Sequence, residues 1–119
     1  MQLELDAYSG VPNPRWELTR PQAAELTAML RRLKPTAAAP AGNDGLGYRG
    51  FVVTDGGEPL DGYDEVRAYR GLVVARRGDR TYTFDDPLRD LEHWMLRAAA
   101  GHVTEPVFQY VATEIHRPG

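Results

Sequence analysis

Cysteine is absent from the 119 residues, and Ser9 is the only serine. Without cysteine the chain can form no disulfide, thiolate nucleophile or sulfur-ligated zinc site, and this absence fits a reducing compartment. The sequence also lacks the G-x-S-x-G and S-x-x-K patterns of serine nucleophiles. Catalysis by a nucleophilic side chain is therefore not expected.

Long apolar runs and basic stripes are missing too. No stretch approaches the roughly 18 apolar residues of a membrane-spanning helix, and the opening MQLELDAYSG lacks the basic and apolar regions of a signal peptide. The net charge is only −3, and the arginines are scattered along the chain. We expect a cytoplasmic protein with no membrane or nucleic-acid partner.

Metal and phosphate motifs do not occur either. The histidines show no H-x-H or H-x-x-x-H spacing, and we interpret them as surface or helix-end residues: His93, His102 and His116. The acidic segment 55–65 fails the EF-hand order, because glycine and proline interrupt it. Glycine patterns that cradle phosphates are absent. The sequence therefore predicts no metal and no cofactor.

The first third of the chain predicts a strand, a turn and a helix. Apolar residues alternate from 2 to 8, which is the period of a half-buried strand, and prolines around Asn13 favour a rigid turn. Thr19 and Gln22 form a capping-box pattern that predicts the start of a helix. Residues 34–47 are rich in proline, alanine and glycine and indicate a surface connection. The buried stripe of the helix is expected to be Leu26, Met29, Leu30 and Leu33.

The rest of the chain predicts a β-meander and further helices. The runs YRGFVVT, VRAYRGLVVARR and RTYTF indicate three antiparallel strands, the last two joined by a Gly78-Asp79 turn. Asp86 as N-cap and Pro87 as first helical residue predict a second helix. Residues 103–119 fit a helix or a strand, and we favour a helix. Its expected cap is Thr104, and the expected stripe of the second helix is Leu88, Leu91, Met95 and Ala98.

These elements predict an α+β fold. The chain is expected to form one domain, residues 1–119, with a small antiparallel sheet and two to three helices. A short meander leaves strand edges and apolar surface that a small monomer covers poorly. We therefore expect a homodimer with an intertwined or extended-sheet arrangement.

Polar and aromatic side chains gather beside the predicted turns. Aromatic rings supply contact area at low entropic cost, and arginine forks bind carboxylates or backbone carbonyls. Such residues suit a peptide-binding groove, although Trp16 and the tyrosines would equally complete a small core. The candidate substrate-binding residues are Tyr8, Ser9, Asn13, Arg15, Trp16, Arg49, Arg67, Tyr69 and Arg70.

Three blocks of the sequence carry a family resemblance. SGVPNPRWEL, GYRGFVV and VRAYRGLVV resemble a family of small bacterial proteins with an S-G-x-P-N-P-x-W signature, which here spans residues 9–16. Within that family, the chain length, the opening LELDAYSG and the block positions are similar to the lysinoalanine synthases of duramycin- and cinnamycin-type lantibiotic biosynthesis. The similarity covers most of the chain.

The resemblance implies an intramolecular aza-Michael addition. A lysine ε-amine of the modified lanthipeptide precursor would add to a dehydroalanine and close the last macrocycle. The base would be the substrate's own hydroxylated aspartate, with no catalytic residue from the protein, and the family is dimeric. Two other interpretations stay open: a module that binds a peptide or small ligand without turnover, and an assembly protein whose aromatics form a dimer interface.

The free energies involved permit a synthase that has no catalytic base of its own. Deprotonating a lysine with a pKa of about 10.4 at neutral pH costs roughly 4 to 5 kcal/mol. Orienting two tethered reactants contributes about 7 to 11 kcal/mol. Positioning of the peptide can therefore outweigh the cost of deprotonation.

Overall fold

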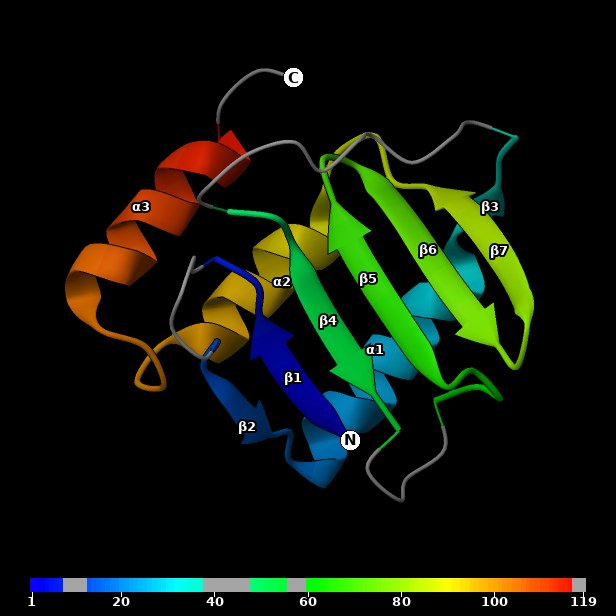
Figure 1. Cartoon of the computed structure of the whole chain (residues 1–119), viewed down its shortest axis with the longest axis horizontal. Helices are drawn as coiled ribbons and strands as arrows, with labels where there is room; N and C mark the ends of the chain where they lie inside the picture. Colours follow the sequence, from blue (N-terminus) through cyan, green and yellow to red (C-terminus); the bar gives the residue numbers. More distant parts are fainter. Residues whose placement is uncertain (8–12, 38–47, 56–59, 117–119) are drawn as a thin grey trace.

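A seven-stranded antiparallel sheet forms the centre of the computed structural model, which describes residues 1–7, 13–37, 48–55 and 60–116. The strand order is β2-β1-β4-β5-β6-β7-β3, and three helices accompany the sheet (Figure 1). The α+β class is confirmed. The elements are β1 Gln2–Leu5, β2 Arg15–Glu17, α1 Arg20–Arg32, β3 Lys34–Pro35, β4 Phe51–Thr54, β5 Glu65–Tyr69, β6 Leu72–Arg77, β7 Arg80–Asp85, α2 Asp90–Ala99 and α3 Glu105–His116.

The predicted meander is present, but it contains four strands. The run VRAYRGLVVARR does not form one strand: it divides into β5 and β6 at Arg70 and Gly71. Both residues have positive φ, 53° and 79°, as the type I′ turn of a two-residue hairpin requires. This turn was hard to predict, because Arg-Gly lacks the asparagine or aspartate typical of its first position.

Both edges of the sheet are formed by short strands that the sequence did not predict. β2 extends from the expected turn and pairs with β1, so that Leu3 lies opposite Trp16. β3 lies within the expected surface connection and pairs with β7. β1 itself is confirmed as a strand, although it ends at Leu5. Pairing to a neighbour decides these assignments, and local sequence does not encode it.

The three helices start for different physical reasons. At α1 the capping box is confirmed, with Thr19 Oγ1 and Gln22 Oε1 each accepting the other residue's backbone N–H. The predicted start of α2 is wrong: Asp86 and Pro87 form a turn before it, and Arg89 is the N-cap in a left-handed conformation. Asp86 still accepts hydrogen bonds from the backbone N–H groups of Asp90 and Leu91. The tail forms α3, which confirms the helix over the strand.

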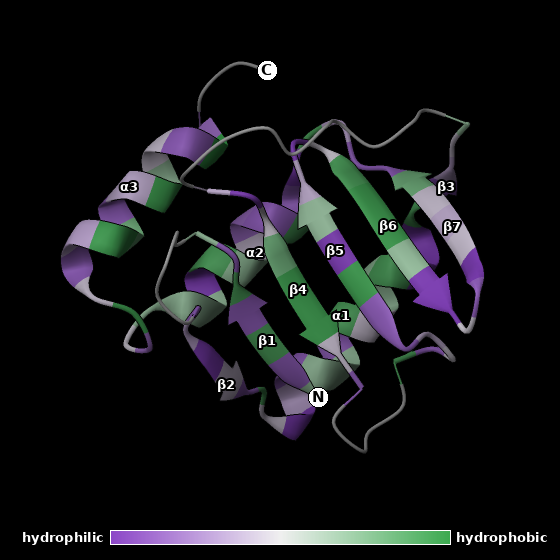
Figure 2. Cartoon of the chain, in the orientation of Figure 1, coloured by the Kyte–Doolittle hydropathy of each residue, from purple (hydrophilic) through white to green (hydrophobic). Residues whose placement is uncertain are grey.

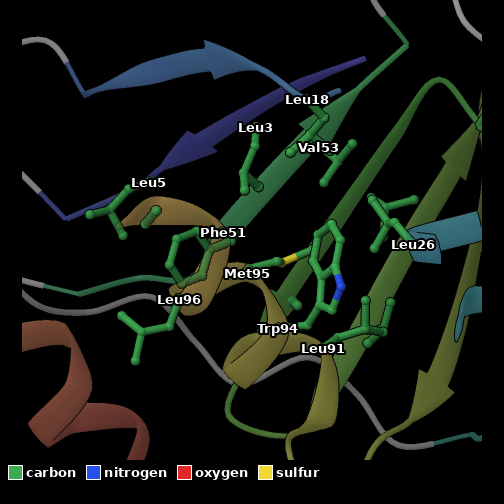
Figure 3. Packing of buried hydrophobic residues seen from close by; sticks show 14 of the residues in the cluster. Leu3, Leu5, Leu18, Leu26, Phe51, Val53, Leu91, Trp94, Met95 and Leu96 are labelled. Atoms are coloured by element: carbon green, nitrogen blue, oxygen red, sulfur yellow. The ribbon is translucent and has the colours of Figure 1, made fainter. Parts of the chain in front are cut away.

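All three helices supply residues to one core, and α1 and α2 lie behind the sheet (Figure 1). Leu3, Phe51 and Val53 project from the strands toward Trp94 and Met95 of α2 (Figure 3). In the expected stripes, Leu26, Leu30, Leu91 and Met95 are buried, whereas Met29, Leu33 and Ala98 are partly buried. The prediction that Leu88 is buried is wrong, because the turn before α2 leaves this residue 75% exposed.

No described helix covers the other face of the sheet, which looks toward the reader in Figure 1. Hydrophobic and hydrophilic residues alternate along β1 and β5 (Figure 2), so one set faces the helices and the other faces outward. We call the outward set the open face. One register row across it consists of Arg15, Glu4, Val52, Arg67, Val74 and Thr83. Within the described residues, no helix is long and apolar enough to span a membrane.

Candidate functional site

The structure divides the predicted substrate-binding residues among three places. Four gather near the end of β1 on the open face, one lies in the core and two lie at the β5–β6 turn. Tyr8 and Ser9 are outside the described residues. The group on the open face consists of Asn13, Arg15, Arg49 and Arg67. The residue in the core is Trp16, and the residues at the turn are Tyr69 and Arg70.

Asp6 is the centre of the first group, and the sequence did not single it out. Its carboxylate lies 2.8 Å from Arg49 Nη2 and 2.8 Å from Arg67 Nη1, and it accepts a third hydrogen bond from Asn13 Nδ2 at 3.3 Å. Only 10% of the Asp6 side chain is exposed. The strand alternation placed Asp6 on the outward face, but only the strand register reveals that arginines converge on it. A buried carboxylate needs such partners, because an unpaired one is costly.

Asn13, which stands between two prolines in the sequence, is engaged at both ends of its amide. Its Oδ1 accepts a hydrogen bond from the backbone N–H of Ala7 at 3.3 Å, and its Nδ2 donates to Glu4 Oε2 at 3.1 Å in addition to Asp6. A backbone hydrogen bond from Leu5 N to Pro14 O reinforces the same closure. Asn13 therefore ties the segment that leads into β2 to β1 and the residues that follow it, which is a positioning role.

Two of the arginines, Arg15 and Arg67, differ in how exposed they are and in how many groups hold them. Arg15 pairs with Glu4 at 3.1 Å, and its side chain is 62% exposed. Arg67 is held more firmly, because Nη1 donates both to Asp6 Oδ2 and to the backbone carbonyl of Arg49 at 3.0 Å. Polar and charged side chains in or next to β1, β2, β4 and β5 thus form one network, which we call the Asp6 cluster: Glu4, Asp6, Asn13, Arg15, Arg49 and Arg67.

Trp16 lies on the opposite side of the sheet from the Asp6 cluster. It is 9% exposed and faces the core beside Leu3. Its indole stacks on the ring of His102, with centroids 4.9 Å apart and planes 3° from parallel. The core interpretation of Trp16 is therefore favoured over a place in a groove on the open face.

Tyr69 and Arg70 lie beside an aromatic contact at the end of β5. The Tyr69 ring meets Tyr48 edge-on at 5.5 Å, and the Arg70 guanidinium carbon lies 5.2 Å from the Tyr69 centroid. Tyr48 in turn donates a hydrogen bond of 2.5 Å to Glu92 of α2. These residues therefore connect the β5–β6 turn to the helical layer.

Glu92 is a buried carboxylate that the sequence analysis missed, and it is 1% exposed. Arg89 donates to both of its oxygens, at 2.9 and 2.7 Å, and Gly71 N donates at 2.9 Å. Burial raises the pKa of Glu92, but the hydrogen bonds from Arg89, Tyr48 and Gly71 outweigh it and lower the pKa overall. Burial, and then the Glu92 charge, raise the pKa of the Tyr48 hydroxyl. With every oxygen engaged, Glu92 is suited to holding α2 against the sheet and not to accepting a substrate proton.

The histidines lie apart from the Asp6 cluster. His93 and His116 meet edge-on between α2 and α3, with centroids 4.9 Å apart, and His102 is the partner of Trp16. Across the described part of the chain, no group of three or more histidine and carboxylate side chains could hold a metal ion.

A groove of about 850 Å³ lies between α1 and the start of α2, on the helical side of the molecule. Its walls mix apolar residues such as Met29 and Leu88 with charged ones such as Arg32 and Asp90. It contains none of the predicted substrate-binding residues.

Chemically, the Asp6 cluster is the arrangement that can recognise an anionic group. Comparisons of the chain with protein-family models, with curated proteins and with solved structures gave no match.

Proposed function

We propose that this protein forms a lysinoalanine cross-link by holding a modified lanthipeptide precursor on its open face, next to the Asp6 cluster. The observation that carries the proposal is the pair Arg49 and Arg67, which Asp6 holds in place on the face of the sheet that no described helix covers. Fixed guanidinium groups orient a peptide at a lower entropic cost than mobile ones. The sequence resemblance supplies the identity of the peptide and of the reaction.

The state of the buried carboxylates supports a base supplied by the substrate. Hydrogen bonds from Arg89, Tyr48 and Gly71 outweigh burial and lower the pKa of Glu92, which makes it a poor proton acceptor. The oxygens of Asp6 already accept hydrogen bonds from Arg67 and Asn13. The protein would then contribute orientation, which can exceed the cost of deprotonating the attacking lysine. A cytoplasmic location, where precursor peptides are made, belongs to the same proposal.

Reconstitution tests the proposal. The purified protein is incubated with a precursor that carries dehydroalanine, thioether rings and hydroxylated aspartate, and an added thiol then labels any dehydroalanine that remains. Because the cross-link changes no mass, protection from the thiol is the measurement. We expect protection with the protein and labelling without it, and a precursor bearing unmodified aspartate should stay labelled. Full labelling under conditions of saturating binding would contradict the synthase activity.

The second candidate is a module that binds a peptide without turnover. The Asp6 cluster favours it as much as it favours the synthase, because a fixed arginine pair recognises an anionic group whether or not a reaction follows. Saturable binding without thiol protection is the outcome expected for this candidate.

A further inference from the structure

We infer that Arg67 is the specificity-determining residue of the open face and that it binds one carboxylate of an extended peptide through its Nε–Nη2 edge. The inference rests on the proposed function only in taking the ligand to be a peptide. It adds the chemical group that is recognised and the side chain that recognises it.

The guanidinium group of Arg67 is oriented with one edge held by the protein and one edge open. Nη1 donates to Asp6 Oδ2 at 2.8 Å and to Arg49 O at 3.0 Å, so both of its hydrogens are occupied. Among the described residues, Nε and Nη2 of Arg67 have no hydrogen-bond partner. The Nε and Nη2 hydrogens point the same way from one edge, and this edge matches the two oxygens of a carboxylate.

Apolar residues flank Arg67 on both neighbouring strands. In the register, Arg67 lies between Val52 of β4 and Val74 of β6. Val52 is only 6% exposed, and 38% of the Arg67 side chain is exposed. Apolar neighbours on both sides reduce the hydration of the guanidinium group, and a charged hydrogen bond is stronger where water is partly excluded. Val74, which is partly exposed, also offers a peptide side chain an apolar contact.

The charge of Arg67 favours an anionic group over a neutral one. Hydrogen bonds between charged groups are shorter and roughly twice as strong as those between neutral groups. Arg67 is held beside Asp6 through Nη1, so its other edge presents a charged pair of donors, which a carboxylate satisfies better than an amide of the same shape.

Two short peptides test this inference without any reaction. Acetyl-Val-Asp-Val-amide and acetyl-Val-Asn-Val-amide have nearly the same shape and differ in one carboxylate. Binding to the full chain is followed by titration in amide and arginine Nε–H NMR spectra. We expect the acid to bind about 10- to 150-fold more tightly than the amide, the ratio expected for one charged hydrogen-bonded pair. The Arg67 Nε–H signal should shift with the acid alone.

Variants assign the effect to a residue. Arg67→Met should remove the preference for the acid, and Arg67→Lys should retain only a small part of it, because an ammonium lacks the two-donor edge. Arg76→Met is the matched control on the same face and should keep the full preference. If Arg67→Met does not fold, the Arg67 Nε–H shift in the unmodified protein decides the question.

Equal binding of the two peptides, or an acid preference that persists in Arg67→Met, would overturn the inference. These results are independent of the thiol-protection experiment. A clear acid preference without any protection of dehydroalanine would contradict the synthase activity and leave the Arg67 site standing. Protection of dehydroalanine that is unaffected in Arg67→Met would contradict the Arg67 site and leave the synthase activity standing.

Discussion

At the scale of single residues, Trp16 shows how a predicted binding residue can belong to the core instead. Its large ring is 9% exposed and stacks on His102. We predict that Trp16→Ala destabilises the protein by about 3 to 5 kcal/mol, the usual cost of deleting a buried aromatic side chain. His102→Ala should cost much less, because His102 is exposed. Urea unfolding monitored by far-UV circular dichroism measures both. A Trp16→Ala variant as stable as the wild type would place the ring outside the core.

Glu92 gives a pH-dependent prediction at the same scale. Its pKa is lowered in the folded protein, so it contributes stability above an unfolded pKa of about 4.3 that is lost as the pH falls through the folded value. Asp86, whose pKa burial raises, acts in the opposite sense. Glu92→Gln should cost about 3 to 5 kcal/mol at pH 7, because it leaves Arg89 without its ionic partner in a buried site.

The comparison of two pH values checks the Glu92 prediction. The stability difference between wild type and Glu92→Gln, measured in urea, should be large at pH 7 and smaller at pH 3. Glu105→Gln is the control, because Glu105 is an exposed glutamate of α3. A difference that is the same at both pH values would show that shape, not charge, is responsible.

At the scale of elements, the β5–β6 hairpin contains one favourable and one strained residue. Gly71 has a φ of 79°, and a Cβ there would lie 3.0 Å from the Asp86 carbonyl oxygen. Arg70 adopts a φ of 53°, which asparagine tolerates better. We predict that Gly71→Ala destabilises by about 1 to 3 kcal/mol, whereas Arg70→Asn stabilises by about 0.5 to 1 kcal/mol. Thermal unfolding measures the two shifts, which should have opposite signs.

How far the elements could be predicted depends on where their stabilising contacts lie. The capping box of α1 is contained in four residues, so the sequence alone identified it. The start of α2 depends on the hydrogen bond from Asp86 N to the carbonyl of Gly71, fifteen residues earlier, and no local pattern records that contact. β2 and β3 likewise exist only through their partners. Elements stabilised by neighbouring residues could therefore be predicted from the sequence, whereas elements stabilised by distant partners could not.

The candidate site follows the same division. Arg49 and Arg67 were chosen for their chemistry, and the sheet brings both to one carboxylate. Asp6 and Glu92 were missed because a single acidic residue in a strand or helix looks like an ordinary surface residue. Their roles become visible only when residues 61 and 44 positions away are placed beside them.

At the scale of the whole molecule, the two sides of the sheet have different roles. The helical layer and the inner face of the sheet form the core, whereas the open face carries the Asp6 cluster. The network between Glu92 and the β5–β6 turn connects α2 to the end of the sheet, so the strands that position Arg67 are supported from behind. The proposed synthase activity would require such support, because orientation of the peptide would be the main contribution of the protein.

The last prediction concerns the expected homodimer. β3 pairs only with Asp85 and Phe84 of β7; among the described residues, the stretch from Arg80 to Tyr82 therefore forms an unpaired strand edge. The hydrogen bond from Thr36 N to Thr83 O shows that the polar groups of Thr83 point outward, and those of Thr81 follow because strand residues alternate. We predict that two copies pair along this edge and give a mass of about twice 13.3 kDa in light scattering. Thr81→Pro removes an outward donor without disturbing the ladder with β6, so it should yield a folded monomer, whereas Thr81→Ala should remain a dimer. A wild-type mass near 13.3 kDa at micromolar concentration, or a dimer that persists in Thr81→Pro, would contradict pairing at β7.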